Sequence, residues 1–273
     1  MDFIQFSFHT ADQEQRDALI ALLSEQPIEG FEETEQDLVA YAPEDRCDEA
    51  YIQEIAGRLS IPFTRSVVGQ RNWNEEWEQG FRPVIIDGFC SIRAGFHAPQ
   101  PGVAYDIVIT PKMSFGTGHH ATTALMITMM RELDFRQKEV FDFGTGTGVL
   151  AILAEKLGAA SILAIDNDIW SYENALENIE RNQCRHITVK QGIADDLEPL
   201  PQFSIILANI NRHILLTYME KMALLLYPDG MLLLSGMLQE DRAMIRESAA
   251  AAGLEYVKEQ AGQNWACMLF RKS

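Results

Sequence analysis

The sequence has few cysteines and no clear arrangement of metal ligands. Its four cysteines lie far apart without a Cys-x-x-Cys pair, and its six histidines show no ligand spacing beyond the adjacent His119 and His120. This usage predicts a reduced, cytoplasmic chain without a structural metal. The chain also lacks a basic segment followed by an apolar one at its start, and its apolar runs are far shorter than the roughly 18 residues that a membrane span needs. We therefore expect a protein that is neither exported nor embedded in a membrane.

Positive charge is scarce as well. Lysine and arginine total 22 against 40 acidic residues, which gives a formal charge of −18. Such a charge opposes phosphate backbones and anionic lipid surfaces, so nucleic acid and membranes are disfavoured as direct partners. The charge is uneven: residues 1–80 contain 18 acidic residues, five arginines and no lysine, and the first lysine is Lys112. The acidity serves solubility or it attracts a basic partner.

The first 70 residues predict a small α+β domain. Ile4, Phe6 and Phe8 alternate as in a strand with one buried face, and the pattern that follows, around 18–23, is helical. Further strands are expected at 31–34, 37–41 and 61–68, with a helix over 48–59. The order βαββαβ is typical of a ferredoxin-like sandwich. We assign residues 1–70 to an acidic ferredoxin-like domain.

Residues 71–110 are expected to join this domain to the rest of the chain. Trp73 and Trp77 stand four residues apart and would share one side of a helix, where packing is their expected role. Short β-like runs follow from Pro83 to Thr110. We describe 71–110 as an aromatic bridge with a short β segment.

Residues 111–273 alternate strand and helix patterns. Helices are expected to start near Gly148, Tyr172, Arg212 and Gln239. The expected strands are 139–143, 161–166, 187–191, 203–209, 231–235, 255–259 and 265–270. This alternation predicts a parallel sheet that is covered on both faces. Only residues 260–264 join the last two strands, which is too short for a crossover helix, so these two strands should pair antiparallel.

A glycine-rich turn follows the first strand of this region. Gly144, Gly146 and Gly148 stand between an apolar strand and a helix, where backbone N–H groups can face a ligand and no Cβ obstructs it. No Gly-Lys-Ser/Thr follows, and the dinucleotide fingerprint would need glycine where Val149 stands, so a P-loop and a nicotinamide dehydrogenase are disfavoured. The turn binds another ligand or is purely structural.

The position of Asp166 favours a ligand-binding role of the glycine turn over a purely structural one. Asp166 ends the next apolar strand, 22 residues after Gly144, where a carboxylate can accept hydrogen bonds from both ribose hydroxyls. The alternative role of a helix cap suits Asp168 better. With the G-x-G-x-G spacing, this arrangement resembles class I S-adenosylmethionine-dependent methyltransferases. The resemblance implies an α/β fold with a seven-stranded Rossmann-like body and S-adenosyl-L-methionine as the cofactor.

Two further segments resemble the ribosomal protein L11 methyltransferase family. The family's loop commonly reads Pro-Gly-x-Ala-Phe-Gly-Thr-Gly-x-His-x-Thr-Thr, and 110–123 matches it from Phe115 to Gly118 and at His120, Thr122 and Thr123. This loop departs from the pattern in that Lys112 replaces the glycine and Ser114 the alanine. The second segment, 205–212, carries Asn209-Ile210-Asn211. The resemblance extends over essentially the whole chain and implies that 111–273 is the methyltransferase domain.

The family's cofactor contacts carry over to Thr123, Gly144, Asp166 and Asn209. Gly146 of the glycine turn is also expected to contact the cofactor. Thr123 is expected in the first turn of a helix, facing the methionine carboxylate or capping the helix. Phe115 is expected to cover the cofactor or to pack.

Asn209 is the expected catalytic residue. It ends a parallel strand beside the point where open α/β sheets keep their sites, and its carbonyl can accept a hydrogen bond from an amine. DNA and glutamine methyltransferases carry Pro-Pro after the corresponding residue, whereas Ile210 and Asn211 follow here, so a planar amide or adenine amine is not the expected acceptor. His120 neighbours threonines in a cofactor loop, so we expect it to brace that loop rather than to act as a base. Asp195 either touches adenine or belongs to a turn.

These assignments imply transfer of methyl groups from S-adenosylmethionine to amino groups of ribosomal protein L11. Lysine side chains are the expected acceptors, with the α-amine as a further one. A methyltransferase of this fold acting on another protein or a small amine remains an alternative, as does an inactive cofactor-binding assembly factor. The acidic residues 1–70 would recognise the basic substrate.

Overall fold

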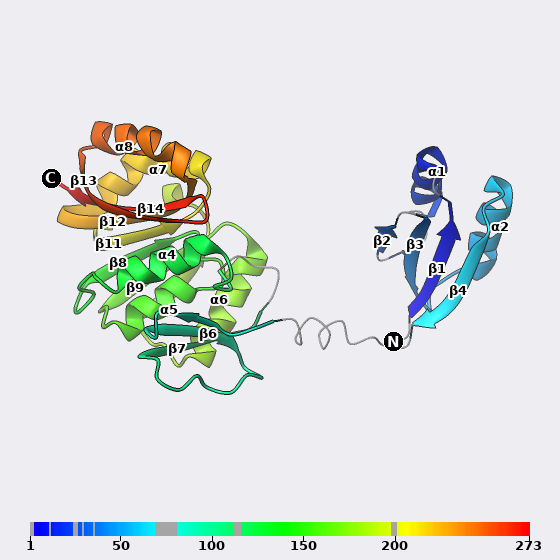
Figure 1. Ribbon diagram of the computed structural model, residues 1–273, viewed down its shortest axis with the longest axis horizontal. Coiled ribbons are helices and arrows are strands. Elements are labelled where there is room, and N and C mark those ends of the chain that lie inside the picture. The colour runs from blue at the N-terminus through cyan, green and yellow to red at the C-terminus, as the bar shows by residue number, and fades with distance from the viewer. Residues whose placement is uncertain are drawn as a thin grey trace. The chain divides into compact units, whose positions relative to one another are not determined.

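A computed structural model describes residues 3–10, 12–23, 27–28, 30–34, 36–68, 81–111, 116–197 and 201–273. The chain divides into two compact units, Met1–Gly80 and Phe81–Ser273 (Figure 1). Among the described helices, none is both long and apolar enough to cross a membrane.

The described part of the first unit contains a sheet of four antiparallel strands and two helices. Its elements are β1 (Phe3–His9), α1 (Gln13–Leu23), β2 (Gly30–Glu33), β3 (Asp37–Pro43), α2 (Glu49–Leu59) and β4 (Phe63–Val68). The strand order β2-β3-β1-β4 is that of a ferredoxin-like sandwich, so the predicted fold is confirmed. Ile4, Phe6 and Phe8 are buried in one cluster with residues of both helices, because side chains alternate between the two faces of a strand.

The second unit is built on a seven-stranded sheet. Its strands are β8 (Glu139–Phe143), β9 (Ser161–Asp166), β10 (Ile187–Gln191), β11 (Phe203–Asn209), β12 (Leu226–Leu238), β13 (Leu254–Gly262) and β14 (Trp265–Lys272). Their order is β10-β9-β8-β11-β12-β14-β13. β14 pairs antiparallel with both of its neighbours, which confirms the predicted hairpin of the last two strands. The order reverses beside β8, and this switch point is where open α/β sheets bind ligands.

Helices cover both faces of this sheet. On one face lie α4 (Ala121–Met130), α5 (Val149–Lys156) and α6 (Ile169–Arg181), and on the other α7 (Arg212–Leu225) and α8 (Arg242–Ala251) (Figure 1). Two separate hydrophobic cores result, one on each face of the sheet. α6 begins three residues before the expected Tyr172, because Asp168 accepts the N–H of Ser171 and caps the helix there.

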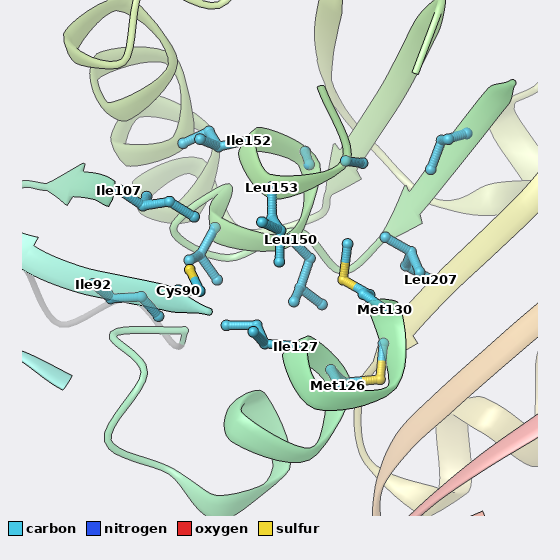
Figure 2. Close-up of a cluster of buried hydrophobic side chains, with 14 of the residues drawn as sticks. Cys90, Ile92, Ile107, Met126, Ile127, Met130, Leu150, Ile152, Leu153 and Leu207 are labelled. Carbon is cyan, nitrogen blue, oxygen red and sulfur yellow. The ribbon is translucent and has the colours of Figure 1, made fainter. Parts of the chain in front are cut away.

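A small sheet packs beyond α4 and α5. It contains β5 (Val84–Ile86), β6 (Cys90–Ala94) and β7 (Tyr105–Ile109) in that order. Figure 2 shows Ile92 and Ile107 of this sheet in the same cluster as Ile127 of α4 and Leu153 of α5. Burial of these side chains explains why residues 81–110 join the second unit, whereas the sequence pattern placed them in a separate bridge. Trp73 and Trp77 lie outside the described residues.

Candidate functional site

A pocket of about 650 Å³ lies at the carboxyl edge of the parallel strands. The ends of three neighbouring strands, β8, β9 and β11, contribute Phe143, Asp166 and Asn209. Further lining residues come from the segments just after β9 and β10, from the first turns of three helices and from the start of β14, among them Asn167, Gly192, Thr122, Ser171, Ile214 and Trp265. The pocket therefore coincides with the switch point of the sheet.

The glycine turn forms part of this wall and approaches it closely. Gly144, Gly146 and Gly148 all have positive φ angles, of 74°, 55° and 80°, which favour glycine. A methyl group at Gly144 would lie 2.3 Å from Cγ2 of Ile210, so a larger residue does not fit there.

Four N–H groups of this turn bind within the protein, whereas the sequence led us to expect that the N–H groups face a ligand. The N–H groups of Gly144 and Thr145 both donate to the carbonyl of Ile165, at 2.9 and 3.0 Å. The N–H of Gly146 donates to Asp166, and that of Gly148 donates to the carbonyl of Thr145. The turn thus lets a bound molecule come close to the backbone, and it fixes the position of Asp166.

Asp166 is anchored by the backbone on both sides. Its Oδ2 accepts the N–H of Gly146 at 2.9 Å, and its Oδ1 accepts the N–H of Asp168 at 3.1 Å. Each carboxylate oxygen retains a further lone pair. The half-buried carboxylate can therefore accept two more donors from the pocket, as a vicinal diol would supply.

Asp142 lies fully buried in β8, two residues before Gly144. Its Oδ2 accepts the hydroxyl of Thr145 at 2.6 Å, and the backbone N–H of Ala151 also stabilises the charged form of the carboxyl group. Burial raises the pKa of this carboxyl to about 7, against the opposing effect of the Thr145 hydroxyl. The glycine turn is therefore bonded, through Thr145, to a carboxyl group whose pKa lies near neutral pH.

Asn209 presents a buried acceptor at the wall of the pocket. The residue is 8% exposed, and its Nδ2 donates to Oγ1 of Thr123 at 3.4 Å. Its Oδ1 is buried without a hydrogen-bond partner in the described part of the chain. Because an unpaired buried polar atom costs free energy, this oxygen is suited to accept a donor from a bound molecule.

His120 caps the helix that carries Thr123. Its Nδ1 accepts the N–H of Thr122 at 3.3 Å and lies 2.8 Å from the Thr122 hydroxyl. The imidazole also packs edge-on against Trp265, with 4.7 Å between the ring centroids. His120 therefore braces the start of α4, as its threonine neighbours led us to expect.

Comparisons with known proteins identify the family. The model of the family described as Ribosomal protein L11 methyltransferase (PrmA) matches residues 5–273. The chain belongs to the ribosomal protein L11 methyltransferase family. A relative of that name from Bacteroides thetaiotaomicron is 40% identical over 278 residues, which cover 99% of each chain. Another from Porphyromonas gingivalis is 41% identical over 260 residues, covering 93% of this chain and 90% of the relative.

A solved structure of the L11 methyltransferase family supports the same assignment. The ribosomal protein L11 methylase from Lactobacillus delbrueckii subsp. bulgaricus superimposes with a TM-score of 0.66 at 27% identity. The match covers 71% of this chain and all of the other. A methyltransferase from Pyrococcus furiosus, at 20% identity and a TM-score of 0.51, shares the fold over 61% of this chain and 89% of its own.

The family's expected cofactor positions fall mostly on the pocket. Gly144, Gly146, Asp166 and Asn209 line it. Thr123 is fully buried behind Asn209 rather than on the wall, where its neighbour Thr122 lies instead. Of the family's loop, Phe115 lies outside the described residues, as do Lys112 and Ser114.

Sequence reasoning missed several residues of this L11 methyltransferase pocket. Tyr218 of α7 and Trp265 of β14 line it, although no motif marks either of them. Asp195 is not among the lining residues; it accepts the hydroxyl of Tyr218 at 3.4 Å, and burial together with this carboxylate raises the pKa of Tyr218. The turn before Asp195 contributes instead, through Gly192 and Ile193. Within the described part of the chain, no group of three or more potential ligands is placed to hold a metal ion.

Proposed function

We propose that this protein is a protein-lysine N-methyltransferase that transfers methyl groups from S-adenosyl-L-methionine to amino groups of ribosomal protein L11. The family match over residues 5–273 carries this proposal. Lysine side chains are the acceptors, with the α-amine as a further one. The proposed substrate is a ribosomal protein, which is incorporated into ribosomes in the cytoplasm. We therefore propose that the reaction takes place there.

The residues of the pocket fit S-adenosylmethionine. Asp166 has free lone pairs for the ribose hydroxyls, and the pocket offers about 650 Å³ beside a turn that leaves no room for a Cβ at Gly144. When bound, the cofactor supplies an electrophilic methyl carbon on a positively charged sulfur. Gly146 and Asn209 complete the proposed set of cofactor contacts. Thr123 is proposed to hold Asn209 in place through the hydrogen bond that it accepts from the Asn209 amide. Phe115 is proposed to cover the cofactor.

Asn209 is the proposed catalytic residue because its Oδ1 can orient the acceptor amine. The amide is held at its other end by Thr123, which leaves the unpaired oxygen fixed in place. The residues that follow are Ile210 and Asn211 rather than a pair of prolines. An aliphatic amine is therefore a better acceptor than a planar amide or an adenine amine.

The contribution of positioning can exceed the cost of holding the acceptor lysine neutral. A lysine with an ordinary pKa of about 10.4 costs roughly 4.6 kcal/mol to hold neutral near pH 7. Alignment of reactants contributes roughly 7–11 kcal/mol. Asn209 thus needs to aim the amine rather than to deprotonate it, and water can take the proton.

The first unit is proposed to recognise the substrate. Residues 1–80 carry 18 acidic residues against five arginines, and Glu44, Asp45 and Glu54 are exposed among the described ones. Long-range attraction would draw a lysine-rich protein to this surface and would weaken with salt. The same charge disfavours direct binding of nucleic acid.

Labelled S-adenosylmethionine tests the proposed function. The protein is incubated with it and with purified ribosomal proteins, and we expect label on L11. Label on another protein or a small amine instead would replace L11 as the substrate. Cofactor binding without any transfer would favour an assembly factor.

A further inference from the structure

Three asparagines at a spacing of four residues, two in α6 and one at its carboxyl end, face the edge strand β7. Asn182 accepts the N–H of Val108 at 3.0 Å and donates to its carbonyl at 2.6 Å. Two residues along the strand direction, Asn178 accepts the N–H of Thr110 at 2.7 Å, and Asn174 donates to the carbonyl of Thr110 at 3.1 Å. These side chains thus pair with the main chain just as a neighbouring strand would.

Asn178 also reaches the glycine turn. Its Nδ2 donates to the carbonyl of Thr147 at 2.8 Å, in a position where the side chain has no exposed surface. Both ends of the amide are therefore satisfied, one by Thr110 and one by the turn. The adjacent turn residue, Gly146, is held by Asp166, which precedes α6. α6 and a residue just before it hold two consecutive residues of the turn.

Thr147 extends this connection to the family's loop. Its hydroxyl donates to the carbonyl of Gly116 at 2.8 Å. Gly116 has a φ angle of 103°, and a Cβ there would lie 2.7 Å from the Thr147 hydroxyl oxygen, so the contact requires glycine. Ala175 of α6 packs against the end of the turn, where a Cβ added at Gly148 would lie 3.4 Å from the Ala175 methyl group.

We propose that Asn178 is a positioning residue for the cofactor. Its hydrogen bond fixes the position of the glycine turn, so that Asp166 and Gly144 can contact the bound molecule. The inference rests on the proposed function, because it assumes that S-adenosylmethionine binds in this pocket. Removal of the amide leaves the carbonyl of Thr147 buried without a donor, and the turn must shift or open to water. Cofactor affinity falls, while the alignment of the acceptor at Asn209 is untouched.

Asn182 provides a matched control. It lies on the same side of α6, at its carboxyl end, and makes two bonds to Val108 of β7, where Asn178 makes one bond to Thr110 just after β7. None of the bonds found for Asn182 reaches the glycine turn. Its replacement by alanine removes two bonds to β7 and one to the carbonyl of Asn178 near the end of α6, and leaves the bond between Asn178 and Thr147 in place.

The test compares Asn178→Ala with Asn182→Ala in the full chain. Binding of S-adenosylhomocysteine is measured by calorimetry, and kcat and KM for S-adenosylmethionine are measured with L11. We expect Asn178→Ala to raise the Kd and the KM at least tenfold with kcat within threefold of wild type, and Asn182→Ala to leave both within twofold. Equal effects of the two variants, or an unchanged Kd in Asn178→Ala, would overturn the inference.

A second pair of variants covers the case in which Asn178→Ala does not fold. Thr147→Val removes the hydroxyl bonded to Gly116 while keeping the shape of the side chain, and Thr147→Ser keeps the hydroxyl. We expect Thr147→Ser to bind S-adenosylhomocysteine at least fivefold more tightly than Thr147→Val, and equal affinities would contradict the connection. Failure of the wild-type protein to bind S-adenosylhomocysteine would instead overturn the proposed function itself.

Discussion

The acidic residues to which we assign roles lie in opposite surroundings in the two units. In the first unit, Glu44, Asp45 and Glu54 are exposed to solvent. In the second, Asp142 is fully buried and Asp166 is tied by two backbone N–H groups at the wall of the pocket. Exposed charge acts at long range and is screened by salt, whereas buried charge acts on the groups that it touches. Acidity is therefore suited to attracting a partner in one unit and to organising a site in the other.

The largest effect should come from Gly144→Ala. The new methyl group would overlap Cγ2 of Ile210, and the φ angle of 74° disfavours alanine. Together these costs should weaken binding of S-adenosylhomocysteine by roughly 10²–10³-fold, measured by calorimetry. Binding of L11 should persist, since the first unit is untouched.

Gly253→Ala is the matched control for this change. Gly253 has a φ angle of 78° but no atom within 4 Å of an added Cβ. It carries the backbone strain without the clash, so its cofactor affinity should stay close to wild type. A similar loss in both variants would mean that strain, and not the shape of the pocket, determines binding.

Asn209→Ala should separate chemistry from binding within the second unit. Loss of the oriented amide should lower kcat by about 10²-fold, while the Kd for S-adenosylhomocysteine changes only a few fold. Asn209→Asp keeps an acceptor oxygen and should retain more transfer than the alanine variant. Rates equal to wild type in Asn209→Ala would remove Asn209 from the mechanism.

Asp142 should make the stability of the second unit depend on pH. Burial raises the pKa of this carboxyl from 3.8 to about 7, so the folded state holds a proton that the unfolded state releases. The contribution of Asp142 to the free energy of unfolding is therefore largest below about pH 4, and it decreases as the pH rises toward 7. Between pH 5 and 7 wild type should lose about 2 kcal/mol relative to Asp142→Asn.

Urea titrations at pH 5, 6, 7 and 8, followed by hydrogen exchange of the β8 amides, report this effect for the second unit alone. Asp45→Asn, an exposed change in the first unit, should leave the pH profile of β8 unaltered. Parallel profiles for wild type and Asp142→Asn would show that Asp142 is ionised throughout.

The smallest effect should come from charge removal in the first unit. A triple variant with Glu44→Gln, Asp45→Asn and Glu54→Gln should raise the KM for L11 several fold at low salt, and the difference should shrink as salt is added. The Kd for S-adenosylhomocysteine should not change. A control triple variant in the second unit removes three exposed acids: Glu220→Gln, Glu240→Gln and Glu247→Gln. Equal effects of both triples would mean that net charge, and not the first unit, attracts L11.

The strand pattern of the second unit could be predicted from the sequence almost to the residue. β8, β9, β10 and β11 match the expected bounds, because strands covered on both faces read as short apolar runs between turns. β12 is longer than expected, since Tyr227, Pro228, Asp229 and Gly230 resemble a turn and yet belong to the strand. Local composition could not reveal this extension.

The site was predictable only where a motif marks it. Asp166 could be placed on the pocket from its spacing to the glycine turn, and Asn209 from its position at the end of an apolar strand together with the family resemblance. The hydrogen bond between Asn178 and Thr147 joins residues 31 positions apart, so no local sequence pattern predicts it. The bonds from the N–H groups of Gly144 and Thr145 were missed for the same reason, because their acceptor, the carbonyl of Ile165, belongs to the next strand.

The pairing of α6 with β7 also bears on the order in which the protein can fold during synthesis. The bonds between Val108 and Asn182 join residues 74 positions apart, and that between Thr110 and Asn178 spans 68. A ribosome adding about 5–20 residues per second needs several seconds to make the intervening chain. The outer edge of β7 therefore stays unpaired on the nascent chain until α6 emerges, and in that interval it is open to chaperones and to other strands.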